Sequence, residues 1–275
     1  MEEYLFLFGL AFVWLVFATV QDFRTREISN WLNFSLIAFA LAYRAFYSAF
    51  FDDWKFFLFG LFGVLIFVGL GYLFYYARIF AGGDAKLLFG LGGVLPFESF
   101  YDYLLIGGGF VLVLFAIGAV YTLIYSAFLA LGNRKRFKIE IGRIIEAHKI
   151  WIYSGAGLVL SLTFIGIILK DFLFLLFGIF LSLIFLIYEY VKIIEKVCMI
   201  KLVDAGRLTE GDWLERDVKI GKNWIRASVH GLSLEQIKIL RRAKKKVWIK
   251  EGVPFAVCFL GAFVLGVWLW KGFWV

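Results

Sequence analysis

The feature that most constrains this chain is a series of apolar stretches, each about as long as a membrane is thick. The 275 residues are 63% hydrophobic, against about 45–50% in ordinary soluble domains. A helix crosses the hydrocarbon core with about 20 apolar residues. Eight stretches are candidate spans: residues 4–21, 31–50, 56–77, 84–97, 103–130, 152–169, 172–190 and 253–271. The sequence therefore predicts an all-α polytopic membrane protein with about six to eight transmembrane helices.

The first and the fourth stretch differ from an ordinary span. The first follows Glu2 and Glu3 and has no small-residue cleavage site, so we interpret it as a span and not as a removable signal peptide. The fourth is short and rich in glycine. We expect its neighbours to bury it, or the chain to bend at Pro96.

The basic residues predict the orientation. If the spans alternate direction, the loops at 22–30, 78–83, 131–151 and 192–252 share one side. These loops and their flanks carry all but four of the 29 Lys and Arg residues, the exceptions being Arg44, Lys55, Lys170 and Lys271. The positive-inside rule then makes this side cytoplasmic. Because the positive charge follows the topology so closely, we interpret it as a membrane signal and expect no nucleic-acid partner.

Residues 192–252 form the one segment long enough to fold in water. Short alternating runs at Trp213–Ile220, Trp224–Val229 and Lys246–Lys250 predict strands. Ser233 and Gln236 have capping-box spacing, which predicts a helix over about Leu234–Ala243. We expect a small cytoplasmic α+β insertion before the last helix. Its basic run is expected to contact anionic lipid headgroups: Arg241, Arg242, Lys244, Lys245 and Lys246.

The remaining metal-binding and redox residue types give little signal. Cys198 and Cys258 are far apart and form neither a disulfide framework nor a zinc motif. His148 and His230 have no ligands at metal-site spacing and are interpreted as surface residues. These residues therefore suggest no metal site.

Two aspartates are the candidates for chemistry, because charges at a membrane are costly unless they have a function. Asp22 closes the first span in QDFRTREISNWLN, and Asp84 opens the fourth in FAGGDAKLL. Span parity places both at the cytoplasmic edge. Two close carboxyl groups tend to share a proton and can activate water, which is aspartic-protease chemistry. The helix dipoles favour Asp84 as the base and Asp22 as the acid.

Structural roles for both aspartates remain open. Asp84 could serve as a helix N-cap, and Asp22 as a solvated turn residue. Gly82 and Gly83 fit the catalytic hypothesis, because residues without side chains allow a substrate backbone to approach the carboxylate.

The two strings together resemble the type IV prepilin peptidase group of GxGD membrane aspartic proteases, most closely its archaeal preflagellin and prepilin branch. The family has an Asp followed by an Ile-x-Asn element, matched here by Asp22, Ile28 and Asn30. Its G-x-G-D motif is matched by Gly83 and Asp84, with Lys86 two residues later. Ala81 replaces the first glycine of the motif, which would be strained if that position required positive φ. The bacterial zinc segment is missing from the nine-residue first loop.

The resemblance implies the activity. The expected reaction is removal of the leader peptide from membrane-inserted archaellin or pilin-like precursors at the cytoplasmic face of the cell membrane. Asp22 and Asp84 would be catalytic. Gly82, Gly83, Ile28, Asn30 and Lys86 would bind substrate or shape the loop. The resemblance implies no metal or cofactor, and neither the precursor nor the oligomeric state is defined by the sequence.

The expected organisation has five parts: a catalytic transmembrane core at 1–130, a basic cytoplasmic loop at 131–151, additional helices at 152–191, the soluble unit at 192–252 and a last helix at 253–275. Two other functions compete with proteolysis. One is an ion- or proton-coupled transporter that uses the same aspartates, although transporters usually place carboxylates near the midplane. The other is a membrane scaffold without catalytic activity.

Overall fold

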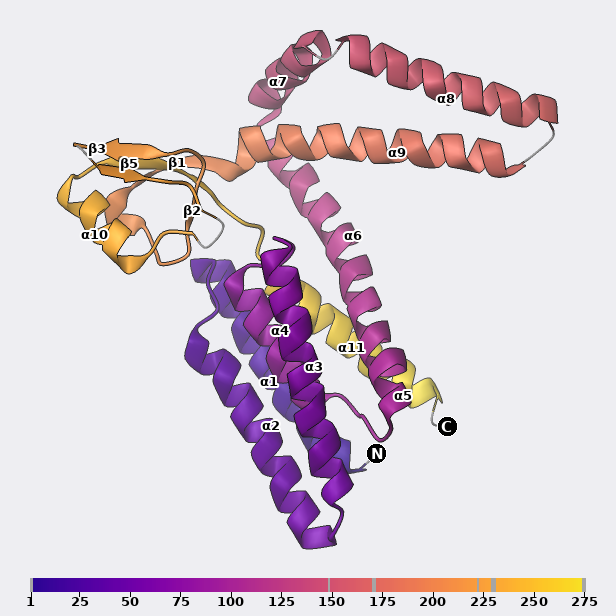
Figure 1. The fold of residues 1–275 in the computed structure, drawn as a ribbon, viewed down its shortest axis with the longest axis vertical. Helices are drawn as coiled ribbons and strands as arrows, with labels where there is room; N and C mark the ends of the chain where they lie inside the picture. The colour runs from indigo at the N-terminus through magenta and orange to yellow at the C-terminus, as the bar shows by residue number, and fades with distance from the viewer. Residues whose placement is uncertain (1, 148, 170–171, 222, 229–230, 274–275) are drawn as a thin grey trace. The chain divides into compact units, whose positions relative to one another are not determined.

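The computed structural model describes residues 2–147, 149–169, 172–221, 223–228 and 231–273 (Figure 1). Four residues discussed above, His148, Lys170, Val229 and His230, lie outside these ranges. The chain is mostly helical and divides into two compact units. The first unit contains the residues up to Leu123 and those from Gly252 onward, and the second runs from Ile124 to Glu251.

Helices build the first unit. They are α1 (Glu2–Thr25), α2 (Asn30–Phe51), α3 (Trp54–Tyr76), α4 (Gly82–Val94), the continuous segment α5 (Phe100–Asp102), η1 (Tyr103–Gly107) and α6 (Gly108–Gly132), and finally α11 (Ala256–Phe273). Among the described residues, α1, α2, α3 and the α5–α6 segment are long and apolar enough to cross a membrane. The prediction of a mostly helical, multi-pass protein is confirmed. A total of six to eight spans stays a prediction.

The short helix α4 lies against α2 and α3. Every residue from Leu87 to Leu95 is buried, which confirms the expectation that neighbouring helices cover this segment. Glycines allow the close approach: a Cβ atom on Gly63 of α3 would lie 2.2 Å from the carbonyl oxygen of Gly92 in α4. The α3–α4 interface is therefore a backbone-to-backbone contact.

Arg44 of α2 holds the far end of α4. Its guanidinium is fully buried and donates hydrogen bonds to the carbonyl oxygens of Gly93 (2.7 Å), Leu95 (2.8 Å) and Phe56 (2.7 Å). Gly93 lies in the last turn of α4, where carbonyl groups have no partner within the helix, so Arg44 satisfies a group that would otherwise be buried and unpaired. The sequence analysis counted Arg44 among the charges of one membrane face, whereas the structure places it in the protein interior.

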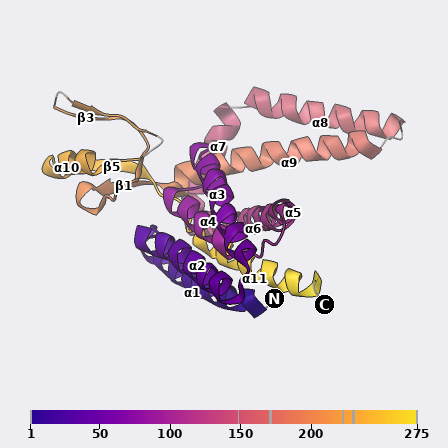
Figure 2. The same ribbon diagram turned by 60° about the horizontal axis from the view of Figure 1, so that its bottom comes forward.

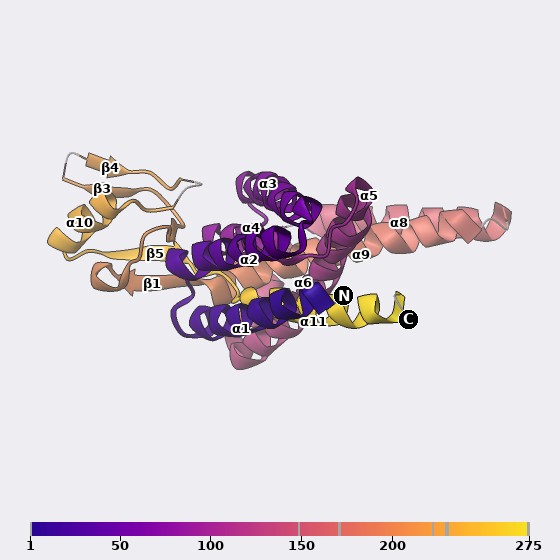
Figure 3. The same cartoon turned by 90° about the horizontal axis from the view of Figure 1, so that it is seen from below.

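Helix α11 packs along α1 (Figure 3). Phe8 of α1 contacts Phe263 of α11 with ring centroids 6.0 Å apart. Leu7 and Leu15 of α1 and Phe259 of α11 are fully buried in the same apolar core. The last helix of the chain is thus part of the first unit, although more than a hundred residues separate it from the rest.

The second unit begins with the end of α6 and continues through α7 (Arg134–Ala147), α8 (Lys149–Leu169), α9 (Phe172–Ile194) and the π-helical turn η2 (Glu195–Met199). The segment expected to be a basic loop therefore contains helix α7. Phe137 of α7 contacts the ring of Tyr190, and Glu140 forms an ion pair with Lys196. These contacts join α7 to the junction between α9 and η2.

A small α/β region completes this unit. The strands are β1 (Ile200–Asp204), β2 (Trp213–Leu214), β3 (Val218–Ile220), β4 (Asn223–Ile225) and β5 (Lys246–Lys250). An antiparallel sheet has the order β1-β5-β2, and β3 pairs with β4 in a hairpin that projects from it (Figure 2). Helix α10 (Leu234–Arg242) begins at the predicted capping box, which is confirmed. Strand β1 was not predicted.

The basic run at the end of α10 is partly used inside this unit. Arg241 donates to the carbonyl oxygens of Ala205 and Leu208. Lys245 donates to the carbonyl of Lys219, and Lys246 pairs with Asp204 at 3.6 Å. Three of the five cations thus hold the α/β region together, and the expected headgroup contact stays a prediction.

Candidate active site

Asp22 lies in the last turn of α1, where the helix ends for a local reason. Arg26 adopts a left-handed conformation with φ of 60°, and its N–H donates to the Asp22 carbonyl oxygen at 2.9 Å. This closes the helix one turn after the aspartate. The Asp22 side chain is only 7% exposed, so the structure does not support its alternative interpretation as a solvated turn residue.

The loop between α1 and α2 is held back against α1. The Gln21 side-chain oxygen accepts from both the N–H and the hydroxyl of Ser29, at 3.1 and 3.0 Å. Ile28 is thereby buried, and its side chain packs against Gly83, where an added Cβ would come within 3.3 Å. The structure therefore brings together Ile28 and Gly83, two residues that the sequence analysis selected from different strings.

Asp84 occupies the first turn of α4, three residues after the N-cap position. That N-cap is Ala81, with φ of −70° and ψ of 164°, so Asp84 is not the N-cap residue. These are ordinary extended values, and the strain considered for alanine at this position does not arise. Asp84 is half-buried, and its carboxyl group interacts with the backbone N–H of Ala81.

The two aspartates lie within electrostatic range of each other, so their carboxylates repel when both are ionised.

Helix α2 contacts the start of α4 through two side chains, Asn33 and Asn30. Asn33 of α2 is fully buried, and its Nδ2 lies 3.5 Å from the carbonyl oxygen of Gly83, directly before Asp84. Close to this contact, the Lys86 ammonium donates to the Asn30 side-chain oxygen at 2.7 Å. Gly82 is less restricted, since its nearest neighbour for an added Cβ is Tyr75 at 3.8 Å.

The first turn of α11 also belongs to this site, which sequence reasoning missed. The backbone N–H of Ala256 donates to Asp22 Oδ2 at 2.9 Å. The buried Cys258 thiol interacts electrostatically with both Asp22 and Asp84. Arg26 further connects the two segments by donating to the Gly252 carbonyl oxygen at 3.3 Å. Almost every residue type has a backbone N–H, so the sequence does not reveal which one donates. Only the resemblance of this last span to the archaeal branch could have drawn attention to Ala256.

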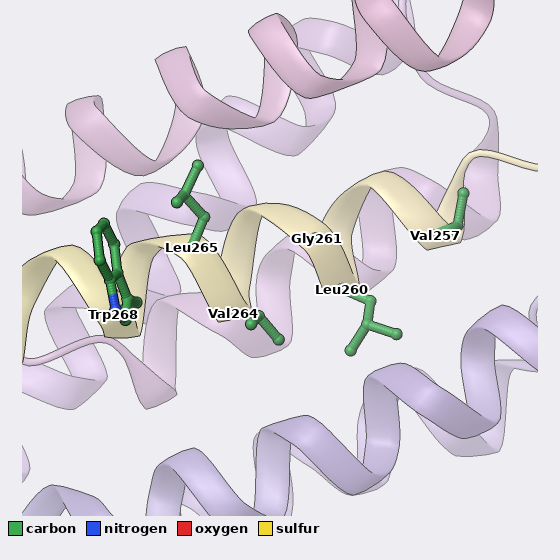
Figure 4. Close-up of a pocket in the computed structure, with 6 residues that line it drawn as sticks. All are labelled: Val257, Leu260, Gly261, Val264, Leu265 and Trp268. Atoms are coloured by element: carbon green, nitrogen blue, oxygen red, sulfur yellow. The ribbon is translucent and has the colours of Figure 1, made fainter. Parts of the chain in front are cut away.

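An apolar groove of about 450 Å³ runs along α11 (Figure 4). Six residues of α11 line that groove: Val257, Leu260, Gly261, Val264, Leu265 and Trp268. None of them carries an acid or a base. Among the residues that the structure describes, no cluster of three or more His, Cys, Asp and Glu side chains could hold a metal ion.

This arrangement, with two carboxyl groups at helix ends inside a bundle of apolar helices, agrees with the family comparison. Residues 9–132 match the model of the type IV leader peptidase family. The resemblance found in the two aspartate strings is thereby confirmed for this part of the chain, which includes α1 to α4 and all seven sequence-selected site residues.

The similar curated proteins are archaeal. The preflagellin peptidase of Methanococcus maripaludis is 35% identical over 82 residues, and that of Methanocaldococcus jannaschii is 29% identical over 82 residues. Each alignment covers 30% of this chain and 35% of the relative, so the match spans about a third of the length of these proteins. No solved structure matches the chain significantly.

Proposed function

We propose that this protein is a membrane aspartic endopeptidase that removes leader peptides from archaellin or type IV pilin-like precursors at the cytoplasmic face. The observation that carries the proposal is that Asp22 acts electrostatically on Asp84, although the two lie 62 positions apart at the ends of two helices within the family-matching segment. The names of the family and of the archaeal relatives support leader processing as the reaction.

The pair has the properties that peptide hydrolysis requires. Repulsion between two neighbouring carboxylates favours a state with one shared proton. In that state one carboxylate takes a proton from a water molecule while the water oxygen attacks the scissile carbonyl carbon. The other carboxyl group protonates the carbonyl oxygen. The apolar helices around the pair support the cleavage of a substrate held at a membrane edge. No observation favours the transporter alternative over this reaction.

The test uses membranes containing the protein and a tagged precursor, with cleavage followed as a size shift. We expect Asp22→Asn and Asp84→Asn each to reduce the cleavage rate at least about a hundredfold, because each removes a proton-transfer group. The matched control is Asp52→Asn, since Asp52 is exposed at the end of α2 in a left-handed conformation that asparagine also adopts. Cleavage that survives either active-site change, in a folded protein, would contradict the proposal.

A further inference from the structure

The first turn of α11 supplies Asp22 with a backbone hydrogen-bond donor. Ala256 is the first residue of α11, and its N–H is one of the groups that find no partner within a helix. Here that N–H donates to Asp22 Oδ2 at 2.9 Å. Ala256 is fully buried, and Asp22 is 7% exposed. A donor held in this way stabilises the ionised carboxylate more than the neutral acid.

The other groups around the two aspartates also favour a negative charge on Asp22 over one on Asp84. Asp22 interacts with the backbone N–H groups of Ala256 and Phe255 and with the positive charge of Arg26. Asp84 interacts with the backbone N–H of Ala81. The charge of Asp22 acts on Asp84, and the charges of both aspartates act on the Cys258 thiol of α11. Asp22 therefore has the stronger support for a negative charge.

We propose that Ala256 is a positioning residue that holds Asp22 as the ionised member of the pair, which makes Asp22 the general base and leaves the proton on Asp84. This inference rests on the proposed protease function. It reverses the assignment from helix dipoles alone, in which Asp22 at the end of α1 was the acid. The reversal arises because Asp22 also lies at the start of α11, where it accepts a direct hydrogen bond.

The protons balance through the cycle. Asp22 takes one proton from the attacking water, and Asp84 gives its proton to the carbonyl oxygen, which produces a tetrahedral diol. Its collapse breaks the carbon–nitrogen bond. Asp22 returns its proton to the leaving nitrogen while Asp84 takes one from a hydroxyl group of the diol. Both groups then have their starting protonation states.

The experiment removes the Ala256 N–H and, in the same bond, weakens the Phe255 carbonyl oxygen as the acceptor of the Cys258 N–H. Replacing Ala256 with its α-hydroxy analogue changes one amide into an ester and adds no side-chain atoms. The acidic limb of the pH–rate profile reports the base, and the basic limb reports the acid. We expect the acidic limb to move to higher pH by about one unit, because a hydrogen bond to a charged group is lost, while KM stays unchanged. The matched control is the same replacement at Val257, the next residue of the turn.

Each outcome decides a different point. Movement of the basic limb instead of the acidic limb would make Asp22 the acid and overturn the inference. A profile equal to that of the Val257 control would show that the Ala256 N–H does not set the protonation state of Asp22, and would overturn the inference. Absence of cleavage by the unmodified protein would contradict the proposed function itself. Assaying the unmodified protein beside the two esters therefore separates failure of the function from failure of the inference.

Discussion

At the scale of single residues, Asn33 is a buried polar group with an atom that lacks a partner. Its side chain is fully buried in α2, and among the described residues its Oδ1 atom has no hydrogen-bond partner. Its Nδ2 atom makes one long contact, at 3.5 Å, with the carbonyl oxygen of Gly83. A buried acceptor without a partner costs free energy. Such a residue is retained at the expense of stability, which is typical of functional sites.

The prediction for Asn33→Leu follows from this imbalance. The apolar side chain removes the unpaired oxygen, so we expect the free energy of unfolding to rise or to fall by less than about 1 kcal/mol. Cleavage should nevertheless slow about tenfold, because the turn before Asp84 loses its contact with α2. Thermal unfolding in detergent and the precursor assay measure the two effects. A stable variant that cleaves at the normal rate would show that Asn33 does not position the turn.

The sequence identifies a site residue only when its side-chain type by itself suggests a function. Asp22 and Asp84 could be selected because ionisable groups at a membrane edge are few and costly. Ile28, Asn30 and Lys86 were selected by family resemblance, and the structure places them around Gly83 and α4. Asn33 ended one of the quoted strings, yet a single amide in an apolar helix has many possible roles. Ala256 acts through its backbone, so no substitution pattern in one sequence can reveal it.

At the scale of elements, the contact between α3 and α4 sets the position of the helix that carries Asp84. Gly63 and Gly92 face each other so closely that a Cβ on either would meet the backbone of the other, at 2.2 and 2.4 Å. Backbone atoms in two packed helices cannot move aside as a flexible side chain can. The depth of α4 in the bundle therefore depends on these two glycines.

We predict that Gly63→Ala lowers the free energy of unfolding by about 1–3 kcal/mol and also slows cleavage, because the added methyl group separates α3 from α4. Gly69→Ala is the matched control on the same helix. A Cβ there meets nothing within 4 Å, and alanine is the better helix former, so stability should hold or increase. Thermal unfolding of both variants tests the contact. Equal behaviour of the two would show that the interface adapts.

The elements themselves were largely predictable because apolar length determines a membrane helix. The spans predicted at 4–21, 31–50 and 56–77 correspond to α1, α2 and α3. Strand β1 was missed because it follows α9 and η2 without a turn residue, and its pairing with β5 is a long-range contact that local patterns do not contain. The interior position of Arg44 was missed because an arginine near a helix end usually indicates the membrane surface.

At the scale of the whole molecule, the described part of the chain forms two units, and every residue of the candidate site belongs to the first. The α/β region of the second unit has its own small apolar core, which includes Leu208, Leu240 and Val247. A core of this size supports only marginal stability. The two units are therefore expected to respond to mutation separately.

We predict that Leu240→Ala destabilises the α/β region by about 2–5 kcal/mol, because it leaves a cavity in this core, while the cleavage rate of the precursor stays unchanged. Limited proteolysis reports the loss of structure. Leu202→Ala in β1 is the control within the same region, since that side chain is half exposed. A fall in cleavage for Leu240→Ala alone would show that the α/β region takes part in the reaction.

The hydrogen bond between Ala256 and Asp22 joins positions that are 234 residues apart. During biosynthesis, Asp22 is therefore inserted into the membrane long before its backbone donor has left the ribosome. The entire second unit must be translated in between. In the proposed mechanism, a nascent chain carries both aspartates early but gains the Ala256 donor only when its last helix arrives, which would make proteolysis a late event of synthesis.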